Sequence, residues 1–183
     1  MRDQPSRRDA ILASSIATLL GLLLTPALLM AEVVADATRG SVVTHGGMDF
    51  GITGGTKVGG NLFHSFDRFN LANGESGTFA GPGDVTNILA RVTGARSSID
   101  GTLRSTIPGA NLFFINPRGV LFGPNAKLEI DGSFTATTAD YVKLSGGGRF
   151  DATTPANDVL IAAPVSTFGF LSSAPAGIQV DRS

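Results

Sequence analysis

From Thr38 onward, the chain consists of short apolar or β-branched runs, each closed within a few residues by Gly, Pro, Asn or Asp. No stretch in this part keeps apolar residues at positions i, i+3, i+4 and i+7 over three turns, so long amphipathic helices are excluded. Glycine supplies 24 of the 183 residues, about twice the usual share of roughly 7%, and favours turns over helices. The pattern predicts an all-β fold of short strands.

The turn signals recur too often for a β-sandwich, in which they are spaced by about 8–12 residues. They fit a parallel β-solenoid, where each coil of about 20–30 residues stacks on the one before it. The clearest predicted strands are residues 111–116, 120–122, 127–130, 133–138, 141–144, 165–171 and 176–180. The candidates for inward-facing core positions are Leu112, Ile115, Val120, Leu128, Ile130, Phe134 and Val142.

Four asparagines stand close to the ends of predicted strands: Asn87, Asn111, Asn116 and Asn125. Asparagine suits tight corners because it tolerates the left-handed region and can hydrogen-bond to nearby backbone. Side-chain ladders between stacked coils are the second interpretation of these residues.

The N-terminal segment has the order of a secretory signal peptide. Arg2, Arg7 and Arg8 precede an uncharged, largely apolar run over residues 10–31. Small residues before Thr38 predict cleavage after Ala37, with Ala31 as a second candidate, so residues 1–37 are the predicted signal peptide and 38–183 the domain. An uncleaved membrane anchor is the competing interpretation, because the run is long enough to span a bilayer.

Composition excludes several classes of protein. Charged residues make up only 16% of the chain and the net charge is -1, which argues against a disordered tail or a nucleic-acid-binding arm. The absence of cysteine from the sequence excludes a disulfide framework, a thiolate zinc site and a cysteine nucleophile. No cofactor or metal site is expected.

Residues that could carry chemistry are few. Neither His45 nor His64 has a cluster of carboxylates near it in the sequence, so packing or capping roles are expected for both. The Gly54-Gly55-Thr56-Lys57 run has the wrong order for a phosphate-binding loop, and no helix pattern follows it. The carboxylates that a glycosidase would need are Asp100, Glu129, Asp131 and Asp140, but none lies in a recognisable catalytic motif.

Three segments carry a family resemblance: NLFHSFDRFNL over residues 61–71, ILARVTGARSSIDGTL over 88–103, and GANLFFINPRGVLFGPNAKLEIDGSFTATTAD over 109–140. They resemble the N-terminal domain of filamentous haemagglutinin-type exoproteins, the haemagglutination activity or two-partner secretion domain. The resemblance implies a right-handed parallel β-helix with an N-terminal cap and extra-helical strands.

The resemblance also implies a function. Such a domain is recognised by the periplasmic modules of a dedicated outer-membrane transporter, which exports a long adhesin or related exoprotein. The expected protein is therefore not an enzyme; it is exported through the inner membrane and is then secreted or held at the cell surface. The alternative is a carbohydrate-binding or carbohydrate-active β-helix protein.

The family's Asn-Pro-Asn-Gly motif corresponds here to Asn116, Pro117, Arg118 and Gly119. These four residues are the candidate for transporter recognition, and a plain corner between two coils is the competing interpretation. Four apolar residues are the candidate cap over the first coil: Leu62, Phe63, Phe66 and Phe69. The last residues offer no polar cap, which predicts an open C-terminal coil able to self-associate, in a fragment or a short complete product.

Overall fold

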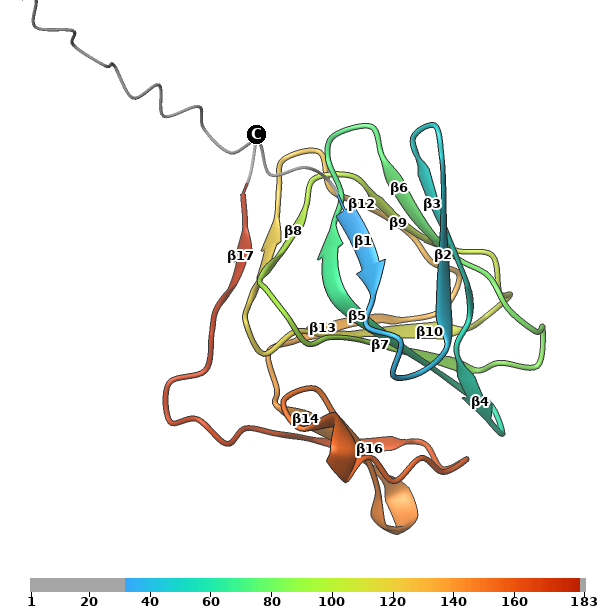
Figure 1. Ribbon diagram of the computed structural model, residues 1–183, viewed down its shortest axis with the longest axis vertical. Coiled ribbons are helices and arrows are strands. Elements are labelled where there is room, and N and C mark those ends of the chain that lie inside the picture. Colours follow the sequence, from blue (N-terminus) through green and yellow to red (C-terminus); the bar gives the residue numbers. More distant parts are fainter. Residues whose placement is uncertain (1–31, 182–183) are drawn as a thin grey trace, which may run out of the picture.

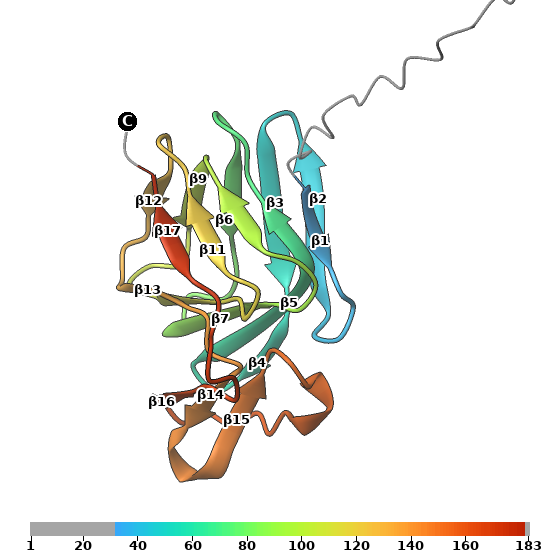
Figure 2. The ribbon, with the colours of Figure 1, turned by 90° about the vertical axis from the view of Figure 1, so that its left-hand side faces the viewer.

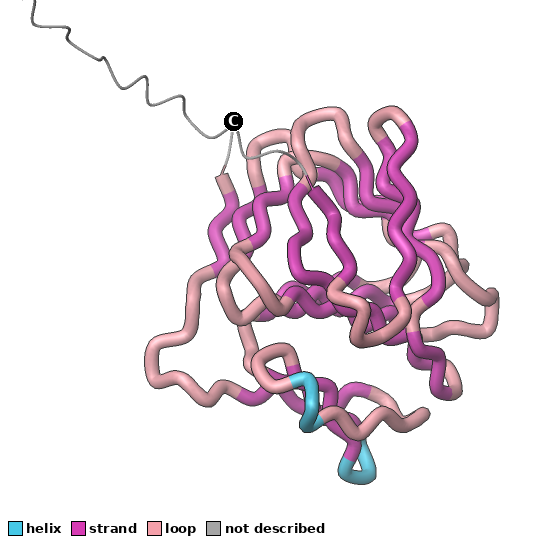
Figure 3. The backbone as a smooth tube through the Cα atoms, in the orientation of Figure 1, coloured by secondary structure: helices cyan, strands magenta, loops and turns pink. Residues whose placement is uncertain are grey.

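The structure, a computed structural model, describes residues 32–181 and is a β-solenoid of about three turns (Figure 1). Among these residues the only helices are two short 3₁₀ segments, η1 (Ser145–Gly147) and η2 (Pro155–Asn157) (Figure 3). The all-β prediction is confirmed. No helix within residues 32–181 is long and apolar enough to cross a membrane.

Three sheets form the sides of the solenoid. In sheet A, four strands run parallel in the order β5 (Asn61–Asn70), β7 (Asn87–Val92), β10 (Asn111–Ile115) and β13 (Phe134–Thr137). In sheet B, the parallel strands are β3 (Asp49–Gly54), β6 (Ser76–Phe79), β9 (Thr102–Ser105) and β12 (Lys127–Glu129). In sheet C, they are β8 (Ser97–Ile99), β11 (Val120–Phe122) and β17 (Ile178–Val180), which lie side by side in Figure 2.

Alternate residues of each strand point into the solenoid, and residues in equal register stack into apolar columns. On sheet A, one column contains Leu62, Ile88, Leu112 and Phe134. The first three are at most 1% exposed, whereas Phe134 in the last coil is only partly buried. Contacts between stacked coils therefore form the hydrophobic core of the solenoid.

Antiparallel strands cover the N-terminal end of the solenoid. β1 (Glu32–Ala35) and β4 (Thr56–Val58) both pair with β5, and β2 (Ser41–Gly46) pairs with β3. Val33 of β1 is 5% exposed and belongs to the core. Residues 32–37, predicted as the end of the signal peptide, thus lie within the fold, while residues 1–31 lie outside the described part of the chain.

A fourth sheet, outside the solenoid, interrupts it after β13. Sheet D consists of β14 (Tyr141–Leu144), β15 (Gly148–Asp151) and β16 (Val165–Gly169), all antiparallel. It packs on the outer face of sheet A, where Phe63 meets Phe150 with ring centroids 5.0 Å apart. The chain then returns to the solenoid as β17, beside β11 (Figures 1 and 2).

An asparagine ladder runs across the coils at the start of the sheet A strands. Asn87 donates to Asn61 Oδ1 and Asn111 donates to Asn87 Oδ1, each at 3.0 Å. Asn111 Oδ1 accepts from the backbone and hydroxyl of Ser133, and Asn61 donates to the carbonyls of Ile161 and Ala163. The rungs are 26, 24 and 22 residues apart, which gives the coil lengths.

The predicted asparagine ladder is therefore present, but partly different residues form it. Asn61 and Ser133 complete it, while Asn116 and Asn125 lie at corners outside it.

All seven predicted strands form, and none is shortened by more than two residues. Of the predicted inward-facing core, Leu112 and Val120 are buried inside the solenoid. Ile115 and Val142 are buried instead between the outer face of sheet A and sheet D. Leu128 is 49% exposed, and Ile130 and Phe134 are partly buried. Leu128, Ile130 and Phe134 lie in the last part of the solenoid, where the structure describes no coil above them.

Candidate functional site

The four residues of the candidate recognition motif form the corner between β10 and β11. Gly119 N donates to the carbonyl of Asn116 at 3.0 Å and closes the turn. Gly119 has φ 104°, a conformation that disfavours residues with a side chain. A Cβ at this position would also lie 3.1 Å from the carbonyl oxygen of Gly177, so glycine is favoured here for two reasons.

Asn116 is fully buried, and both polar atoms of its side chain are hydrogen-bonded within the protein. Its amide nitrogen donates to the Ala95 carbonyl and the Ser97 hydroxyl, both at 2.9 Å, and its Oδ1 accepts from Arg118 N at 2.8 Å. Asn116 thus joins two successive coils at the corner. No polar atom of this amide is left to face a partner.

The exposed part of the corner is Arg118, with Pro117 partly buried beside it. Two hollows meet at Arg118. One, of about 240 Å³, is lined by Thr93, Pro117, Arg118, Asp140, Ala152 and Thr153. The other, of about 350 Å³, is lined by Arg96, Arg118, Ala176, Gly177 and Gln179. The corner therefore offers a cationic side chain between two polar depressions.

The candidate cap residues all lie on β5 and are at most 1% exposed. Leu62, Phe66 and Phe69 belong to the inner core, whereas Phe63 faces sheet D on the outside. They are thus part of the first coil itself. Their role as a cap over that coil stays a prediction.

The two histidines have structural environments, as expected. His45 stacks on Phe50 with ring centroids 4.2 Å apart. His64 is fully buried, and its Nδ1 lies 3.0 Å from the Ser41 hydroxyl. Its Nε2 has no hydrogen-bond partner among residues 32–181. Burial lowers the pKa of His64 to about 4, so the ring is neutral at pH 7.

The four candidate carboxylates are spread over the solenoid and occupied in local contacts. Asp100 accepts from Asn125, Asp131 from Gly109 N, and Asp140 from Leu171 N, while Glu129 pairs with Arg104. Within the described residues, no group of three or more His, Asp or Glu side chains is placed to hold a metal ion.

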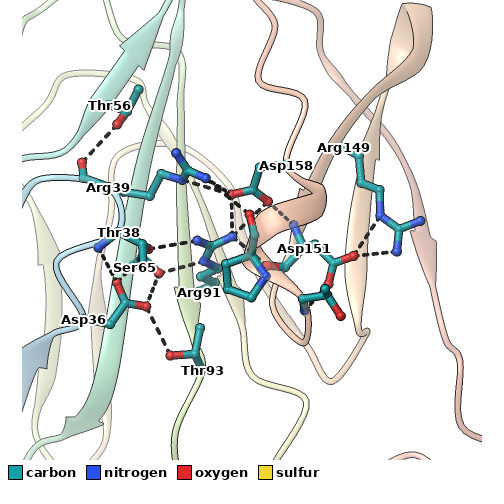
Figure 4. Close-up of polar contacts among 12 residues, drawn as sticks. Asp36, Thr38, Arg39, Thr56, Ser65, Arg91, Thr93, Arg149, Asp151 and Asp158 are labelled. Carbon is teal, nitrogen blue, oxygen red and sulfur yellow. Dashed lines mark hydrogen bonds and ion pairs between the residues drawn. The ribbon is translucent and has the colours of Figure 1, made fainter.

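A buried polar network links the solenoid to the extra-helical sheet (Figure 4). Its centre is Arg91, which points outward from β7 and is 0% exposed. The guanidinium donates to Ser65 Oγ at 2.7 Å, to the Asp151 carbonyl at 2.6 Å, to Thr38 Oγ1 at 3.0 Å, and to both carboxylate oxygens of Asp158. It also lies 4.5 Å from the centre of the Phe150 ring.

Two more residues extend the network across chain segments. Arg39 pairs with the Asp158 carboxylate from the other side, so one buried carboxylate serves two arginines. Asp36 accepts from Ser65, Thr38 and Thr93. Burial raises the pKa of Asp36, but these hydrogen bonds outweigh it and hold the pKa below its ordinary value.

The sequence analysis did not single out this network. Its one sequence signal is Arg91 inside the apolar run Ile88 to Val92, because an arginine in a buried strand requires a partner. The partner, Asp158, is 67 residues away. A pairing between residues this far apart cannot be recognised from sequence spacing.

Coil stacking, an N-terminal antiparallel cover and an extra-helical sheet define a solenoid protein with an exposed corner at Arg118. A sequence model of the TPS secretion domain matches residues 31–179. The chain belongs to this family, the two-partner secretion domain, and the resemblance found from the sequence is confirmed. No curated protein matches the chain.

Proposed function

We propose that this chain is the secretion-targeting module of a two-partner secretion exoprotein and binds the periplasmic modules of an outer-membrane transporter. The family match over residues 31–179 carries the proposal, because it spans almost the whole of the described fold. The family links the chain to export by the two-partner pathway. The solenoid is expected to be right-handed, and the exported product an adhesin or related surface protein.

The proposed contact is the corner at Arg118. Arg118 is exposed between two polar hollows, and Pro117 holds the backbone φ that presents it. Asn116 and Gly119 support the corner from within, because both are buried and committed to internal contacts. An arginine in this position favours a carboxylate or backbone carbonyls on the transporter.

The test is capture of the protein by the periplasmic part of the transporter encoded beside it. Arg118→Glu should weaken capture by tenfold or more and leave the thermal midpoint of unfolding unchanged. Lys143→Glu is the matched control, since Lys143 is exposed on β14 of the extra-helical sheet. Equal capture of both variants would show that the Arg118 corner is not the contact.

Processing is proposed to occur after Ala31. A cut after Ala37 would remove β1, including the core residue Val33, and also Asp36, which accepts hydrogen bonds from Thr38, Ser65 and Thr93. A cut after Ala31 keeps all of these. The mass of the secreted protein distinguishes the two positions, and an N-terminus at Thr38 would contradict the proposal.

The carbohydrate-binding or carbohydrate-active alternative is not favoured. The family is a secretion module, and the candidate carboxylates are bound in separate local contacts.

A further inference from the structure

Arg96 and Arg118 line one hollow at the corner that precedes sheet C. The hollow, of about 350 Å³, is also lined by Ala176, Gly177 and Gln179, and no carboxylate lines it. Five other arginines within residues 32–181 each pair with an Asp or Glu side chain. Within the same range, Arg96 and Arg118 are the arginines without such a partner, and both face this hollow.

The stacking of the coils gives the hollow a floor without side chains. The residues directly before the sheet C strands are Arg96, Gly119 and Gly177, one in each coil. Because the two glycines lack side chains, the Arg96 side chain can extend across the coils. Its Cγ would lie 3.6 Å from a Cβ at position 119, and its Nη2 donates to Gln179 Oε1 in β17. This hydrogen bond orients the Arg96 guanidinium along the corner.

Both guanidinium groups keep hydrogen-bond donors for a ligand. An arginine carries five N–H donors in a planar fork. In the described part of the chain, Arg96 donates only through Nη2, and the Arg118 side chain makes no hydrogen bond. Both side chains are exposed. Two cationic forks beside one hollow favour an anion, and the spacing of their donors matches the two oxygens of a carboxylate.

We propose that Arg96 and Arg118 together bind one carboxylate, which belongs to an Asp or Glu side chain of the transporter's periplasmic modules. The inference rests on the proposed function, which makes the partner a protein and therefore a source of carboxylates. The glycine floor lets the partner's backbone approach closely. The hollow on the other side of Arg118 is less suited to an anion, because Asp140 lines it and repels negative charge.

Capture of the full chain by the periplasmic part of the transporter encoded beside it tests the site. Arg96→Gln and Arg118→Gln should each raise the dissociation constant about tenfold or more, with unchanged thermal midpoints. Because both arginines hold the same carboxylate, the double variant should lose less than the product of the two single effects. Lys143→Gln removes an exposed charge from sheet D and should change the constant by less than about twofold.

Gly177 offers a second test that leaves both arginines in place. A Cβ at this position would meet nothing within 4 Å, so a side chain fits there without displacing its neighbours. Gly177→Glu supplies a carboxylate to the hollow from within the chain and should weaken capture about tenfold or more. Gly177→Gln has the same size without the charge, and it should weaken capture much less.

The outcomes separate this inference from the proposed function. Equal capture of the wild-type chain and Arg96→Gln would overturn the carboxylate site, even where Arg118→Gln is captured poorly. Fully independent losses in the double variant would overturn it as well, since the two arginines would then bind separate groups. Failure to capture the wild-type chain would overturn the proposed function, and this inference with it. If Arg96→Gln abolishes binding to anionic phospholipid vesicles but leaves capture unchanged, the site takes a lipid phosphate and the proposal is wrong.

Discussion

Arg91 Nη1 lies 2.7 Å from Asp158 Oδ2, and this pair ties the second coil of the solenoid to the segment that follows β15 in the extra-helical sheet. The two side chains are 0% and 3% exposed. A charge buried to this extent is tolerable only with its partner, because removal of one member leaves the other without compensation. The attachment of the extra-helical sheet therefore depends on both residues.

Asp158→Asn should lower the free energy of unfolding by about 3 kcal/mol, since it leaves the positive charges of Arg91 and Arg39 without their shared carboxylate. Chemical denaturation at pH 7 measures this loss. Lys57→Ala is the control, because the Lys57 and Asp84 side chains are 32% and 70% exposed and such a pair contributes less than about 1 kcal/mol. Equal losses in the two variants would show that burial does not decide the effect.

Asn87→Ala should break the asparagine ladder in its middle. The substitution removes two hydrogen bonds, one that Asn87 donates to Asn61 Oδ1 and one that it accepts from Asn111 Nδ2. Asn61 Oδ1 and Asn111 Nδ2 each lose their partner in the ladder. We expect a loss of about 2 kcal/mol in the free energy of unfolding. Asn125→Ala, at an exposed corner, should cost less than about 1 kcal/mol. A ladder without energetic value would give similar results for the two variants.

His64 should make stability depend on pH. Its pKa is about 4 in the fold and 6.5 in the unfolded chain, so below pH 6.5 the unfolded chain takes up a proton that the folded one does not. Stability is therefore lost as the pH falls from 6.5 toward 4, by about 2 kcal/mol between pH 7 and 5. The lowered pKa values of Asp36 and Asp151 affect the free energy of unfolding only at more acidic pH.

Denaturation midpoints across this pH range provide the measurement. His64→Phe should remove the decline between pH 7 and 5, while His45→Gln, at an exposed position on β2, should keep it. A decline of the same size in His64→Phe would assign the pH dependence to other groups.

Gly119→Ala should destabilise the corner between β10 and β11. The φ of 104° and the approach of a Cβ to the Gly177 carbonyl both oppose the substitution, and we expect a loss of about 2 kcal/mol or more. Thermal unfolding compares it with Gly83→Ala, where a Cβ would meet nothing within 4 Å. A thermal midpoint unchanged by Gly119→Ala would mean that the corner relaxes without cost.

Much of the solenoid was predictable because its strands are local. Each strand is only a few residues long and is closed by Gly, Pro, Asn or Asp, so positions such as 120–122 and 127–129 follow from short-range signals. The burial of a side chain, in contrast, depends on its neighbours in other coils. Leu128 and Leu103 have the same side chain in the same register, but among residues 32–181 a strand pairs on both sides only of Leu103.

The candidate site was likewise predictable only in part. The turn at residues 116–119 was recognisable from Pro117 and Gly119, whose backbone preferences act on their own. That Asn116 is buried while Arg118 is exposed depends on contacts with Ala95 and Ser97 in the preceding coil. The network around Arg91 requires four separate chain segments to meet, around residues 38, 65, 91 and 151–158, and no spacing in the sequence indicates that they do.

The sequence by itself determined the strand and turn pattern, the all-β solenoid class and the membership of the two-partner secretion domain family, because each rests on short segments read in order. The tertiary structure alone decided which outward-facing residues are covered. Sheet D buries Phe63, Leu89 and Arg91 on the outer face of sheet A. The physical reason is that burial depends on what packs against a side chain, and residues 141–169 reach that face only after the coils have stacked.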